Sequence, residues 1–242
     1  MSKWTRFLFC ADLHGDMQDA PTVAALLKFK EIWKPHIRIL GGDAFDFRPL
    51  RAKASKADQQ EHIGEDVLAG KRFIEAFRPH HFMLGNHDAR LWRTALEGDG
   101  LVQELAQHGV NDIERLCKRI GATIHPYDTR RGVLQIGALN FLHGFYVGET
   151  AAKRHALCFG PCLFGHCHTI STAPVPGLTR LVAQCVGALC QLRMDYNSQT
   201  PSALAQANGW AYGIISPSGD YRVWQAEQID GKWVLPTDTE EL

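Results

Sequence analysis

Five short polar motifs divide this chain, and each one directly follows an apolar run. The motifs combine acidic, amide and imidazole side chains: Asp12-Leu13-His14, Gly42-Asp43, Gly85-Asn86-His87-Asp88, His143-Gly144 and Gly165-His166-Cys167-His168. The apolar runs before them, such as Phe7-Leu8-Phe9, are typical of buried strands. Side chains that follow several strands at the same end meet at one rim of a sheet. The pattern therefore indicates a fold of strands and helices with a site for two metal ions at that rim.

The composition fits one domain over residues 1–242. A chain of 242 residues is long enough to bury a full core, and its hydrophobic fraction of 45% is typical of globular domains. The 26 basic and 26 acidic side chains cancel, so long-range attraction of polyanions is not expected, although a locally basic surface is compatible with this balance. The seven cysteines are an odd number and include no Cys-x-x-Cys pair, which favours reduced thiols over disulfides or a zinc ribbon.

The sequence predicts a cytoplasmic protein without membrane insertion. The N-terminal apolar run is too short for a signal-peptide core. No apolar stretch reaches the roughly 18 residues that a membrane-spanning helix needs. Nothing in the sequence predicts the oligomeric state.

Strands and helices alternate in the first third of the chain, and short strands dominate after residue 122. A helix is expected over 21–33, where Pro21 suits the first turn. Helical segments are expected within 48–78, with Ile63, Leu68 and Phe73 among its apolar residues, and within 89–120, punctuated by glycines such as Gly109. The expected strands are 6–10, 36–40, 81–84, 123–125, 132–136, 139–142, 163–164, 179–182, 210–216 and 221–226.

Taken in order, the five motifs resemble those of the calcineurin-like metallophosphoesterase superfamily. The family blocks are D-x-H, G-D-x-x-D, G-N-H-D/E, a histidine followed by glycine, and G-H-x-H, and all five occur between Asp12 and His168. The resemblance is to the small stand-alone enzymes of bacteria and phages. It implies an α/β fold, a four-layer αββα sandwich of two mixed sheets flanked by helices. The segments 48–78 and 89–120 would be helical insertions that form a partial lid over the active site.

The resemblance also implies a ligand set for two divalent metal ions. Asp43 would bridge the ions, because a shared carboxylate offsets the repulsion between cations about 3.5–4 Å apart. The first ion would be held by Asp12, His14, Asp43 and His168, and the second by Asp43, Asn86, His143 and His166. Mixed carboxylate, amide and imidazole donors favour manganese, with iron, zinc or nickel as alternatives, over calcium.

Catalytic roles follow from the same resemblance. A hydroxide bridging the metals would attack phosphorus in line, and His87 would protonate the leaving group as general acid. Asp46, the second acid of G-D-x-x-D, would orient His87. Asn86 and Arg48 are candidates for contact with the substrate.

Several neighbouring residues have more ordinary interpretations. The basic run of Arg48, Arg51, Lys53 and Lys56 is expected to be a solvated surface, with a cleft that grips phosphate as the alternative. Asp16 and Asp88 are expected to cap helices or to support the ligands. Cys167 should point away from the metals by strand alternation, and a zinc thiolate is the alternative. Structural or exposed roles are expected for seven histidines: His36, His62, His80, His81, His108, His125 and His155.

The departures from the family pattern narrow the substrate class. The protein serine/threonine phosphatases of this superfamily carry arginine directly after the second acid and glutamate at the end of the third motif. Phe47 and Asp88 stand at these positions here, which disfavours a phosphoprotein substrate. His87 stands where the UDP-diacylglucosamine pyrophosphohydrolases carry arginine, which disfavours that substrate. The favoured function is a phosphodiesterase acting on nucleotides or nucleic acid. The alternatives are a phosphomonoesterase (phosphatase), a UDP-diacylglucosamine pyrophosphohydrolase-like enzyme, and an inactive metal-binding scaffold. A nucleic-acid-binding module without chemistry is disfavoured by the zero net charge.

Overall fold

Two mixed sheets form the centre of the computed structural model, which describes residues 4–52, 54–56, 60–178, 181–192 and 201–234. The first sheet has seven strands in the order β12-β11-β10-β1-β2-β3-β4, and the second has five in the order β5-β6-β7-β9-β8. The strands are β1 Thr5–Cys10, β2 Ile37–Leu40, β3 His81–Met83, β4 Thr123–His125, β5 Leu134–Ile136, β6 Leu139–Leu142, β7 Cys162–Phe164, β8 Ile170–Val175, β9 Leu181–Val186, β10 Trp210–Ile215, β11 Tyr221–Ile229 and β12 Lys232–Val234. The helices are η1 Gly15–Met17, α1 Ala20–Trp33, η2 Arg48–Leu50, α3 Ile63–Phe77, α4 Asp88–Glu97, α5 Gly100–Ile120, α6 Ala151–Phe159 and η4 Pro201–Ala205.

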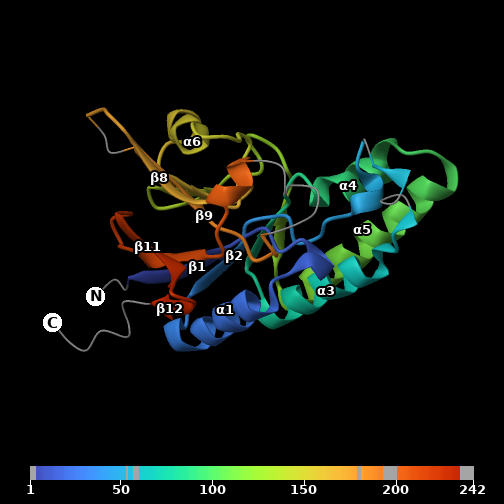
Figure 1. Ribbon diagram of the computed structural model, residues 1–242, viewed down its shortest axis with the longest axis horizontal. Helices are drawn as coiled ribbons and strands as arrows, with labels where there is room; N and C mark the ends of the chain where they lie inside the picture. The colour runs from blue at the N-terminus through green and yellow to red at the C-terminus, as the bar shows by residue number, and fades with distance from the viewer. Residues whose placement is uncertain (1–3, 53, 57–59, 179–180, 193–200, 235–242) are drawn as a thin grey trace.

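The alternation of β1 shows how the layers are stacked. Successive side chains of a strand point to opposite faces, so Phe7 and Phe9 lie in the core between the two sheets. Leu8 and Cys10 lie on the other face, in the core shared with the helices. Figure 1 shows α6 beyond the second sheet and α1, α3 and α5 beyond the first. The predicted four-layer α/β sandwich is therefore confirmed.

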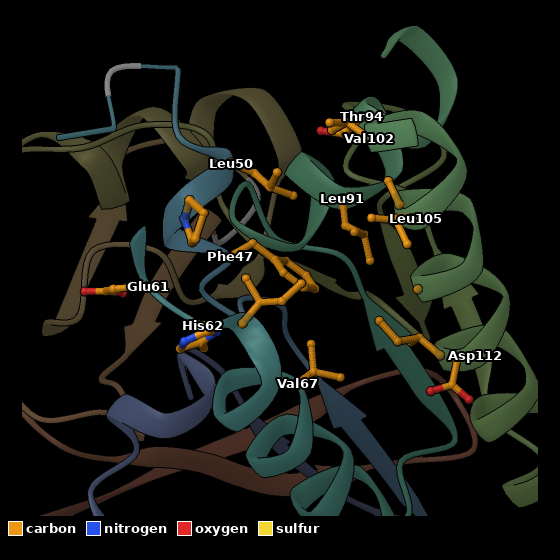
Figure 2. A pocket seen from close by; sticks show the side chains of 15 residues that line it. Phe47, Leu50, Glu61, His62, Val67, Leu91, Thr94, Val102, Leu105 and Asp112 are labelled. Atoms are coloured by element: carbon orange, nitrogen blue, oxygen red, sulfur yellow. The ribbon is translucent and has the colours of Figure 1, made fainter. Parts of the chain in front are cut away.

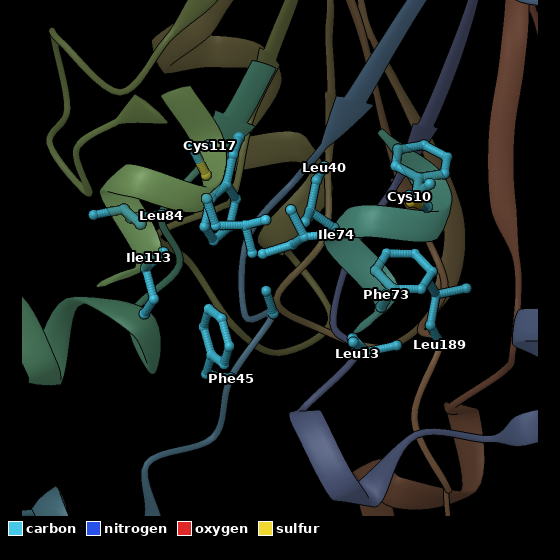
Figure 3. Close-up of a cluster of buried hydrophobic side chains, with 14 of the residues drawn as sticks. Cys10, Leu13, Leu40, Phe45, Phe73, Ile74, Leu84, Ile113, Cys117 and Leu189 are labelled. Carbon is cyan, nitrogen blue, oxygen red and sulfur yellow. The ribbon is translucent and has the colours of Figure 1, made fainter. Parts of the chain in front are cut away.

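The larger core lies between the first sheet and its helices (Figure 3). Its side chains include Leu40 of β2, Phe73 and Ile74 of α3, and Ile113 and Cys117 of α5. Thus α3 and the second half of α5 belong to the helical layer that covers the sheet. The same core also contains Leu91 and Ala95 of α4 and Ala106 of α5, so both segments 48–78 and 89–120 take part in this packing. Their role as a lid stays a prediction.

The helical periodicity of α3 corrects one detail of the predicted apolar face. The buried positions are Asp66, Gly70, Phe73, Ile74 and Phe77, spaced three and four residues apart. Leu68 falls off this stripe, and Ile63 continues it but stands in the first turn of the helix; both are exposed, contrary to the sequence prediction. Gly109 also differs from expectation, since it lies inside α5, where Leu91 packs against it.

The C-terminal half contains elements that the sequence did not predict, namely α6, β8 and β12. The hairpin of β5 and β6 is confirmed, with Ile136 paired to Leu139. The expected strand 179–182 falls partly on residues 179–180, which lie outside the described residues, and β9 runs on to Val186. Among the described residues, none of the helices combines the length and apolar character required to cross a bilayer.

Candidate metal centre

Five strand exits converge on one rim, as the spacing of the motifs predicts. In the first sheet β1, β2 and β3 are parallel neighbours, and in the second β6 and β7 are. Every predicted ligand follows one of these strands within a few residues. The exits are joined by backbone hydrogen bonds, such as His14 N–H to the Asp43 carbonyl at 2.9 Å and Gly165 N–H to the His143 carbonyl at 2.8 Å. The rim is therefore a connected loop layer rather than a set of independent turns.

Backbone strain is concentrated at the predicted ligands. Nine non-glycine residues in the described part of the chain have a positive φ angle, and five of them are predicted ligands. These five are Asp12 (59°), His14 (53°), Asp43 (49°), His166 (69°) and His168 (56°). The left-handed region is unfavourable for residues with a Cβ, and such strain persists where the surrounding structure enforces it. The fold therefore aims these side chains inward at a conformational cost.

Two glycines allow the buried carboxylates to approach the backbone closely. A Cβ at Gly85 would lie 2.1 Å from Asp43 Oδ1, and one at Gly165 would lie 2.4 Å from Asp12 Oδ2. Both distances are far below van der Waals contact, so only glycine fits. This explains why glycine precedes Asn86 in the third motif and His166 in the fifth.

One group of donors gathers around His14 and His168. Their Nε2 atoms lie 3.1 Å apart, and His168 Nε2 is 3.5 Å from Asp12 Oδ1. Asp12 is fully buried and accepts the His166 backbone N–H at 2.9 Å. Burial alone would raise the pKa of Asp12, but His168 and His143 lower it, so the carboxyl group stays ionised.

A second group gathers around His143. Its Nε2 lies 3.3 Å from Asp43 Oδ2 and 3.0 Å from Asn86 Oδ1, while its Nδ1 lies 2.9 Å from the Gly41 carbonyl oxygen. Burial lowers the pKa of His143, but the Asp43 carboxylate outweighs it and raises that pKa to about 9. His166 belongs to the same candidate group as Asp43 and His143. Burial and the neighbouring His143 lower its pKa to about 4.

His87 and Asp46 form the pair that the sequence predicted. His87 Nδ1 is hydrogen-bonded to Asp46 Oδ1, and His87 Nε2 points toward Asp43 Oδ2 at 3.9 Å. Burial would raise the pKa of Asp46, but its contacts with His14 and His87 hold the pKa well below the usual value. The side chain of His87 is 16% exposed whereas that of His14 is 2% exposed, so His87 is the more accessible imidazole.

Three arginines surround Asp46, and two of them come from the basic run. Arg51 Nη2 lies 3.1 Å from Asp46 Oδ2, and Arg48 Nη1 lies 3.4 Å from the same atom. Arg90 Nη1 donates to the Asp46 carbonyl at 2.7 Å. Arg48 also contacts Asp16 at 2.8 Å and forms an ion pair with Glu61. The expectation of a solvated surface is therefore wrong for Arg48 and Arg51, because buried Asp46 attracts guanidinium groups. Lys56 is exposed, and Lys53 lies outside the described residues.

The ordinary interpretations of the nearby acids and thiol agree with the structure. Asp88 accepts the backbone N–H groups of Phe45 at 2.9 Å and Gly85 at 2.8 Å, so it supports two motifs rather than facing the donors. Burial and the nearby Asp43 raise the pKa of Asp88 to about 8. Cys167 Sγ is hydrogen-bonded to the Tyr146 carbonyl at 3.3 Å, away from the donor groups.

Among the residues of the candidate metal-binding groups, Cys190 is the one that the sequence analysis missed. The buried thiol of Cys190 lies 3.7 Å from His168 Nδ1 and forms a candidate metal-binding group with His14 and His168. The segment around it is fixed to the first motif by a hydrogen bond from Leu189 N–H to the Asp12 carbonyl at 3.0 Å, and to η1 by one from Gln191 N–H to the Met17 carbonyl at 2.8 Å. Cys190 stands in none of the five motifs, so no local pattern could have identified it.

The chemistry of these donors fits divalent metal ions. Three overlapping groups of His, Asp and Cys have ligand atoms within 4.8 Å of one another, and Asp43 and His14 each belong to two groups. Carboxylate and imidazole donors together suit manganese, iron and zinc. Bringing buried carboxylates and several imidazoles to face one another is costly unless a cation lies between them.

Comparison with known proteins agrees with this geometry. The profile of the calcineurin-like phosphoesterases matches residues 5–148, more than half of the chain. A search among curated proteins found no match. Similar solved structures include vacuolar protein sorting 29 from Cryptosporidium parvum, with 13% identity, a TM-score of 0.46, and coverage of 96% of this chain and 95% of that chain. They also include YfcE, a phosphoesterase from E. coli, with 12% identity, a TM-score of 0.39, and coverage of 92% and 98%.

These structural similarities are too distant to support an argument about function. The family profile spans four of the five motifs, and the fifth is in place beside them on the same rim. By this match the chain belongs to the calcineurin-like phosphoesterase family, the metal-dependent hydrolases of phosphoester bonds.

Proposed function

We propose that this phosphoesterase cleaves phosphodiesters at two divalent metal ions bridged by Asp43. The observation that supports this most strongly is the position of Asp43 Oδ2, which lies 3.8 Å from His14 Nε2 and 3.3 Å from His143 Nε2. His14 contacts His168, which contacts Asp12, while His143 contacts Asn86 and belongs to a group with His166. An oxygen shared by two donor groups is what a dinuclear centre requires.

Manganese is the proposed metal, with iron, zinc or nickel as alternatives, on the strength of the mixed oxygen and nitrogen donors. When bound, the ions would polarise the phosphoryl group and offset the charge that develops on its oxygens. Asn86 Oδ1 points to His143 Nε2 at 3.0 Å, which leaves its amide NH₂ group available to donate to a phosphoryl oxygen.

His87 is the proposed general acid. Asp46 accepts the hydrogen bond of Nδ1, which leaves Nε2 to carry the proton toward the leaving group. Contacts with His14 and His87 outweigh burial and hold the pKa of Asp46 well below its usual value, so Asp46 orients the ring without taking the proton. Arg48 is already engaged by Asp16, Asp46 and Glu61, so contact with substrate would require it to exchange one of these partners.

A general acid serves an alkoxide leaving group, so diesters are chemically accessible, and diester cleavage is the prediction carried over from the sequence analysis. Nucleotides or nucleic acid as substrate, and the cytoplasm as location, stay predictions of the sequence analysis. A phosphomonoesterase remains the second candidate of the same chemistry.

The test is hydrolysis of bis-p-nitrophenyl phosphate beside p-nitrophenyl phosphate, using protein stripped of metal and refilled with Mn²⁺. We expect Mn²⁺-dependent cleavage that prefers the diester, and its loss in Asp43→Asn. Asp220→Asn, in the turn between β10 and β11, is the matched control and should keep full activity. A preference for the monoester would identify a phosphatase. Metal binding without turnover of either ester would support the inactive scaffold instead.

A further inference from the structure

We propose that a cavity beside the metal centre binds an aliphatic group of the substrate. This inference rests on the proposed function, because the group in question is esterified to the phosphate that is cleaved. The cavity has a volume of about 350 Å³ and lies between η2, α3, α4 and α5. Figure 2 shows Leu50, Val67, Leu91 and Leu105 gathered around Phe47. Its size falls within the range of small-molecule sites.

The cavity is lined by residues that are chain neighbours of those that hold the catalytic pair. Phe47 lines it and directly follows Asp46, the partner of His87. Leu91 also lines it and directly follows Arg90, which donates to the Asp46 carbonyl at 2.7 Å. From the other side, Arg48 joins Asp46 to the lining residue Glu61. A group bound in the cavity would therefore lie close enough to be esterified to a phosphate at the metal centre.

The lining offers apolar contact and little hydrogen bonding. Three of its four polar side chains already have partners within the protein: Thr94 Oγ1 donates to the Arg90 carbonyl at 2.9 Å, Asp112 pairs with Lys71, and Glu61 pairs with Arg48. A nucleobase placed here would leave most of its hydrogen-bonding edge unpaired, which is costly. An aliphatic group has no such requirement, so the lining favours it.

Three apolar residues of the cavity wall remain in contact with solvent. Ile63, Val102 and Leu105 are 41%, 57% and 61% exposed. Removing such side chains from water is favourable. An alkyl chain of the substrate that covers them would therefore gain binding energy from each methylene that it buries. Leu96 of α4 and Leu101 of α5 are more exposed, at 77% and 68%, and do not line the cavity. They provide a matched control for surface hydrophobicity.

The experiment uses Mn²⁺-loaded protein and a series of p-nitrophenyl alkyl phosphodiesters, from methyl to octyl. We expect KM to fall as the chain lengthens, by up to about fourfold for each methylene that is fully buried. The double variant Val102→Gln/Leu105→Gln should lose this dependence while it keeps its rate on the methyl ester. The double variant Leu96→Gln/Leu101→Gln should keep the dependence. Because all four side chains are exposed, the melting temperature should hardly change.

Three outcomes would overturn the proposal. These are a KM independent of chain length, equal loss of the dependence in both double variants, and a monomer–dimer equilibrium broken only by the cavity variant. The last would show that a second copy of the chain covers the cavity. If no ester is cleaved, the proposed function fails, and calorimetric binding of octylphosphonate to wild type and to the cavity variant still decides whether the cavity takes an aliphatic chain.

Discussion

The metal rim and the α6 layer bury histidine in opposite ways. On α6, His155 is fully buried, its Nδ1 lies 2.8 Å from the Ala151 carbonyl oxygen, and its Nε2 accepts the Phe145 N–H at 2.9 Å. Its ring also stacks on Phe164. At the rim, by contrast, His14 and His168 face each other at 3.1 Å, and His143 faces Asp43. Both ring nitrogens of His155 have a backbone partner, whereas the rim imidazoles face one another and carboxylates that they share.

This difference shows what distinguishes a metal site from a structural histidine. Burial is the same in both regions, so burial alone carries no functional information. The rim differs from the surroundings of His155 in two respects. Its carboxylate and imidazole groups face one another, and its backbone is strained at the candidate ligands.

The largest effect is expected for Asp43→Asn, because one oxygen of Asp43 serves both donor groups. Loss of the bridging charge should reduce diester hydrolysis by more than the roughly 10³-fold that removal of a single stabilising donor costs. The rate is measured with Mn²⁺ at saturation, beside the Asp220→Asn control. Activity within tenfold of wild type would show that Asp43 is not a bridging ligand.

His87→Gln should lower the rate by about 10²- to 10⁴-fold for a diester with an alkoxide leaving group. The loss should be much smaller for bis-p-nitrophenyl phosphate, because nitrophenolate leaves without a proton. Comparing the losses on the two esters shows whether His87 acts as a general acid or as a metal ligand. An equal loss on both esters would assign His87 to metal binding instead.

The buried His155 of α6 should make the stability of the protein depend on pH. Burial lowers the pKa of His155 to about 4, from about 6.5 in the unfolded chain. Below pH 6.5 the unfolded state binds a proton that the folded state does not, so stability falls as the pH drops toward 4. The shift corresponds to about 3 kcal/mol.

The check is urea unfolding of metal-free wild type and His155→Gln between pH 7 and pH 4.5. The stability advantage of wild type should shrink by a large part of that 3 kcal/mol, while His108→Gln, an exposed histidine on α5, should behave like wild type. An advantage that does not change with pH would contradict the buried neutral state of His155.

The smallest effect is expected at Cys190, which contacts the far nitrogen of His168. Groups in this position usually change metal affinity by about 10- to 100-fold. Cys190→Ala should weaken Mn²⁺ binding within that range, and Cys190→Ser should restore part of it because a hydroxyl can still contact Nδ1. Cys117→Ala, a buried thiol on α5, is the control. Equal binding in all four proteins would make Cys190 a packing residue only.

Much of the fold could be predicted from the sequence because its signals are local. The apolar runs before the motifs identified the strands that carry the ligands, and the family pattern identified the two sheets. Other elements depended on distant contacts. β8 alternates half-buried and exposed residues but contains Pro174 and no fully buried side chain, and the buried face of α6 consists of His155 and three alanines, which give a weak apolar signal.

The residues of the candidate site also differ in whether a local sequence signal identifies them. The candidate ligands and the contact of His87 with Asp46 were predicted because these residues stand inside contiguous motifs. Arg51, Arg90 and Cys190 were not assigned to the site, because their neighbours are brought together only by folding. The basic run was expected to be solvated because its sequence does not show that a buried carboxylate lies beside it.

The central claim is that two metal ions share Asp43, and a count of bound metal tests it most directly. Metal-stripped wild type and Asp43→Asn are dialysed against Mn²⁺, and the bound metal per chain is measured by mass spectrometry. We predict two ions per wild-type chain and at most one in the variant. A single ion in wild type, or two ions bound with unchanged affinity in the variant, would contradict the account.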